Sequence, residues 1–240
     1  MAQSDNATPH QAAVYDQAVR QTIPHYETMH REALDLVRTI QPDVCQWLDT
    51  GAGTGYMVEL ALAQFPRSQF ALADPAEAML ERARLRLATS LGARVTILPA
   101  TPSERIATVY RGLPPQVITA MLCHHYLPPD GRRQAVRACH DVLAEGGLFI
   151  SFENIAPSTE TGVALGLERW MRFQREQGRP ADVVEEHRRR YGIKHFPIDV
   201  EAHLRLLREV GFAAVELFWF SQMQAGFFAV KGNLCPSQRV

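Results

Sequence analysis

The residues whose types and spacing suggest a ligand site lie in one short stretch, which runs from Asp49 through Gly51, Gly53 and Gly55. An apolar run at 44–48 precedes it, and a helical run at 57–64 follows it. Glycine at such a turn adopts backbone angles closed to other residues and lets a ligand approach the backbone N–H groups. The stretch predicts a ligand site made by Asp49, Gly51, Ala52, Gly53 and Gly55, with an ordinary tight turn as the alternative.

A second acidic residue, Asp74, ends the next strand, 25 positions after Asp49. A carboxylate at this sheet edge can accept hydrogen bonds from both hydroxyls of a ribose. The other interpretation is an N-terminal helix cap before Pro75, and one side chain can do both. We expect Pro75 and Met79 to line the same nucleoside pocket, although Met79 also fits an apolar helix stripe.

Two histidines, His124 and His125, follow the fourth strand at the same predicted sheet edge. A neutral imidazole can accept a proton near pH 7, so both are candidate catalytic bases; capping of local backbone is the alternative. Glu153 follows the fifth strand and is expected to contact the substrate or to pair with an arginine. Cys123 beside the histidines suggests a metal, but adjacent side chains diverge and no further ligand is apparent, so no metal is predicted.

The order of elements predicts an α/β fold with a doubly wound, mainly parallel seven-stranded sheet. The strands are expected at 44–48, 69–74, 94–98, 116–122, 148–152, 213–220 and 226–230. Helical patterns separate most of them, which is typical of a parallel sheet. The link between the last two strands is short, so the final strand should be antiparallel.

Two segments outside this alternation are expected to cover the site of one domain that spans residues 1–240. Residues 1–41 carry two amphipathic helices, which predict a lid with Tyr15 over the substrate and Tyr26 over the cofactor. Residues 154–198 predict a helical insertion or cap. Its charged cluster at 187–190 fits a solvated helix face, from which Arg188 could still turn inward to bind an anion. Arginines 132, 133 and 137 are also expected on a solvent face.

The overall composition argues against several classes of partner. The 240 residues carry a net charge of −1, with an isoelectric point near 6.8. This balance gives no long-range attraction to nucleic acid or to an anionic membrane. No apolar run approaches the roughly 18 residues of a membrane span. We therefore expect a cytoplasmic protein that binds a small molecule, with a homodimer as one option for its assembly.

The pattern Asp-x-Gly-x-Gly-x-Gly at 49–55 resembles the first motif of the class I S-adenosylmethionine (SAM) dependent methyltransferases. The resemblance implies a Rossmann-like fold, SAM as the cofactor, and in-line transfer of its methyl group to a small molecule. It also implies that Asp49 meets the ammonium group of SAM. Many family members hold the adenine amino group with an acid after the third strand. This chain has no acid there before Glu104, so we expect Thr101, or the backbone alone, to contact the adenine.

The outer segments, which include Arg20-Gln21-Thr22-Ile23-Pro24-His25-Tyr26 and Val200-Glu201-Ala202-His203, resemble the carboxy-SAM synthases. That resemblance implies prephenate as co-substrate, and an arginine of the insertion, Arg188 by its spacing, that binds the extra carboxylate. The glycine loop and the stretch at 123–126 differ from that group. The prediction is therefore methyl transfer to a small molecule, with carboxy-SAM synthesis or a non-catalytic SAM-binding module as alternatives.

Overall fold

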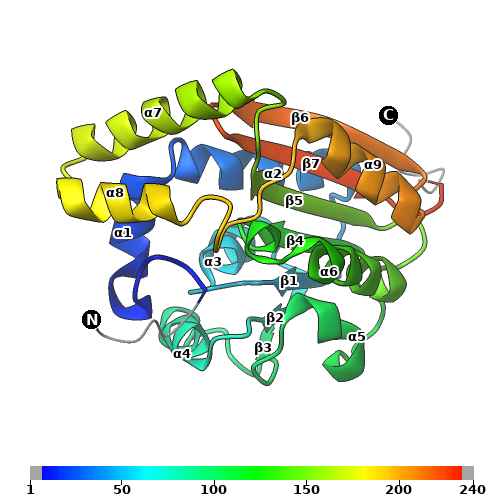
Figure 1. The fold of residues 1–240 in the computed structure, drawn as a ribbon. Coiled ribbons are helices and arrows are strands. Elements are labelled where there is room, and N and C mark those ends of the chain that lie inside the picture. Colours follow the sequence, from blue (N-terminus) through cyan, green and yellow to red (C-terminus); the bar gives the residue numbers. More distant parts are fainter. Residues whose placement is uncertain (1–6, 234–240) are drawn as a thin grey trace.

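The computed structural model describes residues 7–233, which fold around one seven-stranded sheet (Figure 1). The strands are β1 (Gln46–Thr50), β2 (Gln69–Ala73), β3 (Val95–Ile97), β4 (Val117–Met121), β5 (Leu148–Asn154), β6 (Ala214–Ser221) and β7 (Gln224–Val230). Their order in space is β3-β2-β1-β4-β5-β7-β6. The five strands β1 to β5 run parallel, and β7 is antiparallel to both β5 and β6. The predicted sheet is confirmed, with β7 inserted between β5 and β6 so that β6 forms the edge.

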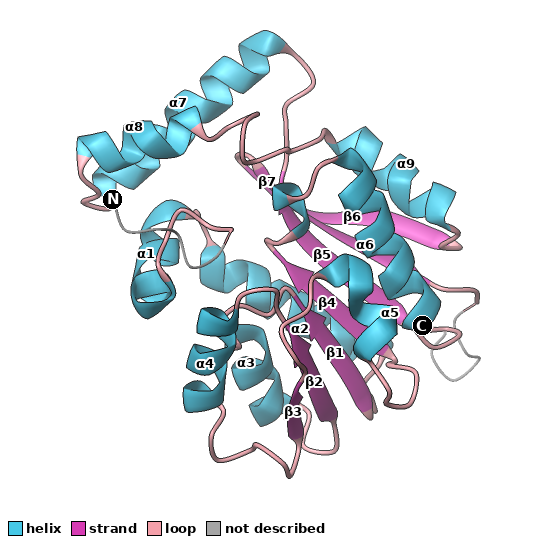
Figure 2. Ribbon diagram, turned by 60° about the horizontal axis from the view of Figure 1, so that its bottom comes forward, coloured by secondary structure: helices cyan, strands magenta, loops and turns pink. Residues whose placement is uncertain are grey.

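Helices cover both faces of the sheet (Figure 2). They are α1 (Tyr15–Thr22), α2 (Tyr26–Ile40), α3 (Tyr56–Gln64), α4 (Glu77–Arg86), α5 (Ile106–Val109), α6 (Pro129–Val142), α7 (Glu160–Glu176), α8 (Ala181–Arg189) and α9 (Val200–Val210). One buried apolar cluster joins α2, α3 and α4 to the sheet, and a second joins α5, α6 and α9 to its other face. The buried strands are apolar on both faces, as a doubly covered parallel sheet requires.

The glycine loop links β1 to α3 in a conformation that demands glycine. Gly51, Gly53 and Gly55 have φ angles of +62°, +54° and +78°. A Cβ atom on Gly51 would lie 2.4 Å from Cβ of Cys123, and one on Gly55 would lie 3.0 Å from Cδ1 of Leu87. A Cβ atom on Gly53 would meet no protein atom within 4 Å. Gly51 and Gly55 thus pack against neighbouring elements, whereas Gly53 faces open space.

The helical insertion, α7 and α8, lies between β5 and α9 in the chain and packs against the N-terminal helix α1 (Figure 1). The buried indole of Trp170 joins them, since its Nε1 donates a hydrogen bond of 2.6 Å to the carbonyl of Thr22. Thr159 caps α7 by accepting from the amide of Gly162. The residues predicted as an insertion therefore form two helices that contact the N-terminal segment.

Two details differ from the sequence-based expectations. Arg132, expected on a solvent face, is 2% exposed, because its guanidinium donates to the carbonyls of His124, Leu127 and Phe196. Glu153 lies within β5 rather than after it. No helix in residues 7–233 is long and apolar enough to cross a membrane.

Replacing Trp170 by alanine tests how firmly the insertion is held. Trp170→Ala removes a buried aromatic side chain and its bond to Thr22, so the free energy of unfolding should fall by about 3–5 kcal/mol. Chemical denaturation measures this loss, and limited proteolysis should show faster cleavage within 156–198. The exposed Arg172 on the same helix supplies the control, Arg172→Ala, which should change neither quantity. Equal cleavage rates in the two variants would contradict this packing role.

Candidate active site

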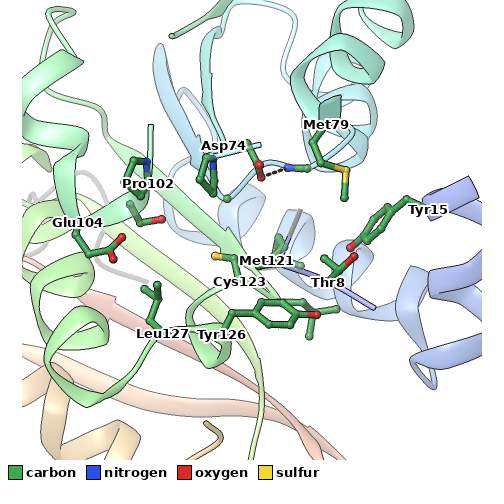
Figure 3. Close-up of a pocket in the computed structure, with 16 residues that line it drawn as sticks. Thr8, Tyr15, Asp74, Met79, Pro102, Glu104, Met121, Cys123, Tyr126 and Leu127 are labelled. Atoms are coloured by element: carbon green, nitrogen blue, oxygen red, sulfur yellow. Dashed lines mark hydrogen bonds between the residues drawn. The ribbon is translucent and has the colours of Figure 1, made fainter. Parts of the chain in front are cut away.

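A large cavity opens at the carboxyl ends of the parallel strands (Figure 3). The space at this strand-end cavity measures about 620 Å³ when the part open to solvent is included. It brings together the glycine loop, the end of β2, the segment after β3 and the end of β4. Its lining includes Tyr15, Gly51, Gly53, Asp74, Pro75, Met79, Ser103, Glu104 and Cys123. The position is the edge at which open α/β sheets bind ligands.

A second space, the glycine-loop cavity, continues from the first toward α2 and α3. Its volume is about 300 Å³, and it shares Tyr15, Gly51, Gly53 and Met121 with the strand-end cavity. Its other lining residues include Tyr26, His30, Asp49, Ala52 and Tyr56. The shared residues place the two cavities next to each other along the glycine loop.

The carboxyl of Asp49 is buried in the glycine-loop cavity with one oxygen unused. Asp49 is 1% exposed, and its Oδ1 accepts a 2.6 Å hydrogen bond from Thr119. Its Oδ2 has no partner among the described residues. Burial raises the pKa of Asp49 to about 7. An unpaired buried carboxyl oxygen is costly, so this site is suited to a cationic group.

The carboxyl of Asp74 is already part of the structure that holds the glycine loop. Its Oδ2 accepts from the amide of Gly53 at 2.9 Å, and its Oδ1 accepts from the amide of Ala76 at 2.9 Å. Burial raises its pKa, and these two amides oppose that rise. Each oxygen retains a lone pair for a ligand hydroxyl, so the helix-capping and ribose-binding interpretations are compatible.

Sequence reasoning missed Glu104 as a residue of the strand-end cavity. Glu104 lines the cavity, and its Oε2 is buried without a partner among residues 7–233. Thr101, which was expected at this place, is buried outside the lining and donates its hydroxyl to the carbonyl of Pro99. The sequence did contain a signal for this role. Glu104 is the first acidic residue after the third strand, and a short loop separates it from the end of that strand.

The N-terminal helix is fastened to the glycine loop through Asp16. Its carboxylate accepts from the hydroxyl of Thr54 at 2.7 Å and from the guanidinium of Arg86 at 2.7 Å. The adjacent Tyr15 then stands where the cavities meet. Tyr26 stacks on Tyr56 with ring centroids 5.7 Å apart. The predicted lid residues Tyr15 and Tyr26 thus both line the candidate site.

A third space, the histidine cavity, lies on the far side of Tyr15. Its volume is about 310 Å³, and it shares Tyr15, Leu122 and Tyr126 with the strand-end cavity. The N-terminal segment, α1, α8 and the ends of β4 and β5 enclose it. Its polar lining residues are His10, Thr22, His125, Asn154 and His187. A second ligand here would adjoin a ligand in the strand-end cavity.

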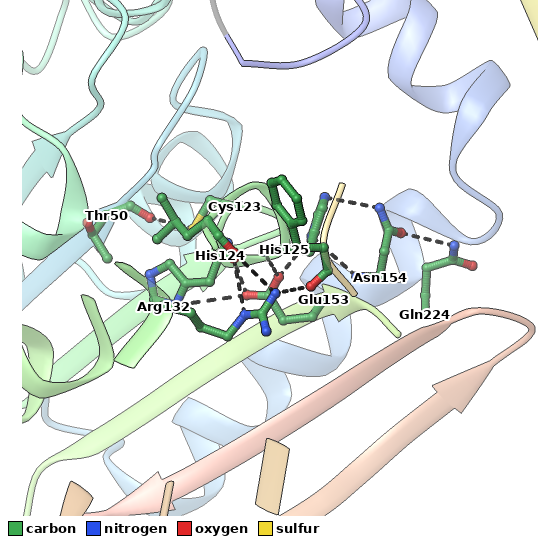
Figure 4. Close-up of polar contacts among 10 residues, drawn as sticks. Thr50, Cys123, His124, His125, Arg132, Glu153, Asn154 and Gln224 are labelled. Carbon is green, nitrogen blue, oxygen red and sulfur yellow. Dashed lines mark hydrogen bonds and ion pairs between the residues drawn. The ribbon is translucent and has the colours of Figure 1, made fainter. Parts of the chain in front are cut away.

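His125 lines the histidine cavity, but both its ring nitrogens have protein partners (Figure 4). Nδ1 lies 2.8 Å from Oε2 of Glu153, and Nε2 lies 3.0 Å from Nδ2 of Asn154. Burial lowers the pKa of His125 to about 3, so the ring is neutral at pH 7. The side chain of Asn154 thus faces Nε2, while its backbone N–H donates to Nδ1 at 3.3 Å, so Asn154 and Glu153 together hold the ring in place.

Glu153 is fully buried and joins β5 to the turn after β4. Its oxygens accept from the backbone amides of His124, at 3.3 Å, and His125, at 2.9 Å. Burial raises the pKa of Glu153 to about 7. The turn includes Leu122 in the left-handed region, with φ of +56°, so these bonds hold a strained backbone at the cavity wall.

Five of the candidate residues line none of the three cavities, namely Gly55, Thr101, His124, Glu153 and Arg188. His124 stacks on Phe149 and lines a separate space with Arg132 and His203, on the side of α6 and α9. Arg188 is exposed on α8 and lines none of the three cavities. His187, its buried neighbour, faces the histidine cavity instead.

The residues of the two connected cavities match the groups of SAM. Asp49 offers an unpaired oxygen to an ammonium group, and Gly53 leaves open space beside the loop for a ligand backbone. Asp74 offers its remaining lone pairs to a ribose. Glu104 offers an unpaired oxygen to an adenine amino group. The donor set therefore fits an aminoacyl nucleoside.

Comparisons with known proteins agree with this geometry. Residues 48–149 match the family model described as a methyltransferase domain. The chain is 23% identical over 221 residues to carboxy-SAM synthase of Helicobacter hepaticus, covering 87% of each chain. It is 28% identical over 232 residues to carboxy-SAM synthase of Wolinella succinogenes, covering 92% of this chain and 91% of that protein.

The fold is also found in solved structures. An O-methyltransferase family protein from Burkholderia thailandensis superimposes with a TM-score of 0.62 at 14% identity, over 91% of this chain. The chain spans 63% of the length of that protein. Fold, sheet order and the match over 48–149 agree: residues 48–149 form a methyltransferase domain, the chain has the class I fold of the SAM-dependent methyltransferases, and its distant curated relatives are carboxy-SAM synthases.

Proposed function

We propose that SAM binds across the strand-end and glycine-loop cavities. Asp49 takes its ammonium group, and the backbone of Gly51, Ala52 and Gly53 surrounds its methionine part. Asp74 takes the ribose, with Pro75 and Met79 beside the nucleoside. Glu104 takes the adenine amino group, while Tyr26 closes the methionine end. Gly55 supports the loop by its packing on Leu87. The observation that supports this placement best is the unpaired, buried Oδ2 of Asp49.

We propose further that the second substrate is a small molecule in the histidine cavity and that the reaction is carboxy-SAM synthesis. The similarity to carboxy-SAM synthases supports this, because it covers about nine tenths of the chain, including the N-terminal helices and the insertion. By that resemblance prephenate supplies the carboxyl group: the bond between its ring and the carboxyl carbon breaks, the ring hydroxyl leaves as water by taking up the proton lost from the methyl group of SAM, phenylpyruvate remains, and the carboxyl carbon bonds to the methyl carbon. Tyr15 then separates the two substrates, and His125 with Glu153 holds the cavity wall.

Methyl transfer to a small acceptor is the second candidate. The plain glycine loop Gly51-Ala52-Gly53-Thr54-Gly55 favours it, as do O-methyltransferases of the same fold. The sulfonium is already activated, so the main task of the protein is to place the nucleophile and the methyl carbon in line. His124 has no path to that carbon through the three cavities, so we assign it to the support of the turn.

We extend the proposal to the organisation of the chain. Residues 1–240 form one catalytic unit, in which 1–41 act as the lid and 154–198 as the cap over the histidine cavity. A cytoplasmic location and a homodimer complete the proposal.

The first prediction concerns the product. Purified protein incubated with SAM and prephenate should form a SAM derivative heavier by one carboxyl group, detected by mass spectrometry. SAM incubated alone with the protein is the control. Two results together would favour methyl transfer instead. SAM would remain unchanged in the presence of prephenate, and the labelled methyl group of SAM would be transferred to a small acceptor from a metabolite mixture.

The second prediction concerns Gly53. Gly53→Leu places a side chain in the open space where the ligand lies, so the Kd for SAM should rise by about 100-fold or more in calorimetry. Gly92→Leu is the matched control, because Gly92 has φ of +74° and also meets no atom within 4 Å. Each substitution costs about 1–2 kcal/mol of folding stability for its left-handed backbone. Equal affinities of the two variants for SAM would show that the cofactor does not bind at this loop.

The third prediction concerns pH. Binding of the ammonium group requires the Asp49 carboxylate, and burial raises the pKa of this carboxyl to about 7 in the free protein. Binding below pH 7 must therefore release a proton. The affinity for SAM should rise about tenfold or more from pH 5.5 to pH 7.5. Asp49→Asn should bind more weakly and lose this dependence. A wild-type affinity that does not change with pH would contradict the pairing.

A further inference from the structure

We propose that Asp16 is a positioning residue that holds the N-terminal helix α1 against the glycine loop and thereby sets how slowly the cofactor leaves its site. This deepens the proposed function and rests on it in one respect, since it takes SAM as the ligand beside that loop. The attachment consists of Asp16, Thr54 and Arg86 and is named the α1 clasp.

The α1 clasp joins three elements through polar groups that all have partners. The hydroxyl of Thr54 donates to Oδ1 of Asp16 at 2.7 Å and accepts from Nη1 of Arg86 at 2.7 Å. The Nη2 group of Arg86 donates to Oδ2 of Asp16, also at 2.7 Å. Thr54 belongs to the glycine loop, and Arg86 is the last residue of α4. Hydrogen bonds to a carboxylate are stronger than neutral ones, so Asp16 ties α1 to both elements.

The clasp is shielded from water. Thr54 is 2% exposed, and the side chains of Arg86 and Asp16 are 17% and 28% exposed. The pair is therefore screened less by salt than an ion pair on the open surface, which usually contributes little. The ring of Tyr56, at the start of α3, lies 5.6 Å from the guanidinium of Arg86 and 5.0 Å from that of Arg20 in α1. These contacts between cation and ring support the same docking of α1.

Helix α1 is attached differently at its two ends. At its C-terminal end the carbonyl of Thr22 accepts from Trp170 of the insertion. In its first turn, among the described residues, Asp16 alone makes side-chain hydrogen bonds to another element. Tyr15 adds apolar packing beside Met79 of α4. Loss of the clasp would therefore loosen the first turn while the opposite end stays attached.

The first turn of α1 forms a wall of the proposed cofactor site. Tyr15 lines both the strand-end and the glycine-loop cavities, and Tyr26 of α2 lines the second. Ala7 and Thr8, which precede α1, line the strand-end cavity. A bound cofactor leaves faster when this wall moves away from the glycine loop. The strength of the clasp should therefore determine the dissociation rate constant, koff.

The chain offers a matched control for Asp16. The guanidinium of Arg86 has a second carboxylate partner, because its Nε lies 3.2 Å from Oε2 of Glu59 in α3. It also donates to the carbonyl of Thr54 at 3.0 Å. Arg86 keeps these partners when Asp16 is changed. Asp16→Asn and Glu59→Gln each remove one negative charge beside the same guanidinium, but only the first removes it from α1.

The experiment measures koff for SAM in the whole chain. Each protein is loaded with labelled SAM and then mixed with an excess of unlabelled SAM. In Asp16→Asn koff should rise at least about tenfold, because a neutral amide accepts weaker hydrogen bonds from Thr54 and Arg86. Glu59→Gln should keep the rate of the wild type. Equal rates in all three proteins, or the same increase in both variants, would overturn the inference.

A pair of variants at Thr54 gives a second test that does not depend on the folding of Asp16→Asn. Thr54→Val removes the hydroxyl at almost unchanged volume and should also release SAM faster than the wild type. Thr54→Ser keeps the hydroxyl and should release SAM several times more slowly than Thr54→Val. Equal release by these two variants would contradict the clasp, because a purely steric role of Thr54 predicts the greater loss in Thr54→Ser.

Hydrogen exchange separates this inference from the proposed function. Backbone amides of 15–22 should exchange faster in Asp16→Asn than in Glu59→Gln, while those of the central strands stay unchanged. If the wild type failed to bind SAM, the cofactor site would be contradicted, and exchange would still show whether Asp16 fastens α1. If the wild type bound SAM and Asp16→Asn altered neither exchange nor koff, the cofactor site would stand and the role of Asp16 would be rejected.

Discussion

The structure depends on one hydrogen bond, from the amide of Gly53 to the carboxylate of Asp74. It joins the loop after β1 to the end of β2, two strands that are neighbours in the sheet. Together with the bond from the amide of Ala52 to the carbonyl of Ala73, it fixes the loop relative to the end of β2. The same carboxylate begins α4 through Ala76, so one buried group sets the positions of a loop, a strand end and a helix.

Charge is distributed unequally along the site. The glycine-loop and strand-end cavities contain Asp49, Asp74 and Glu104, each with carboxyl oxygen capacity left for a ligand. The histidine cavity is lined by imidazoles, neutral polar groups and apolar side chains, with no carboxylate among its described lining residues. A cofactor that carries positive charge on its sulfonium and ammonium groups suits the first region. The site is thus polarised along the direction in which two substrates would meet.

The sequence predicted the sheet, because buried parallel strands are apolar runs and the glycine loop has a clear spacing. It also placed Asp49, Asp74, Met79 and Tyr15 at the cavities. It could not predict which histidine would face a cavity, since that depends on how β5 and α8 pack. Arg132 looked solvent-exposed because nothing local shows that carbonyls from distant turns converge on it.

Tyr15 lines all three cavities, so it forms a common wall between the cofactor and the second substrate. A shift of the Tyr15 ring that enlarges the cavity of one ligand therefore changes the volume left for the other ligand. Thermodynamic linkage makes such an effect reciprocal: the factor by which the cofactor changes the affinity for the second substrate equals the factor by which the second substrate changes the affinity for the cofactor. Cooperativity between the two ligands would then originate in a single side chain of the N-terminal helix.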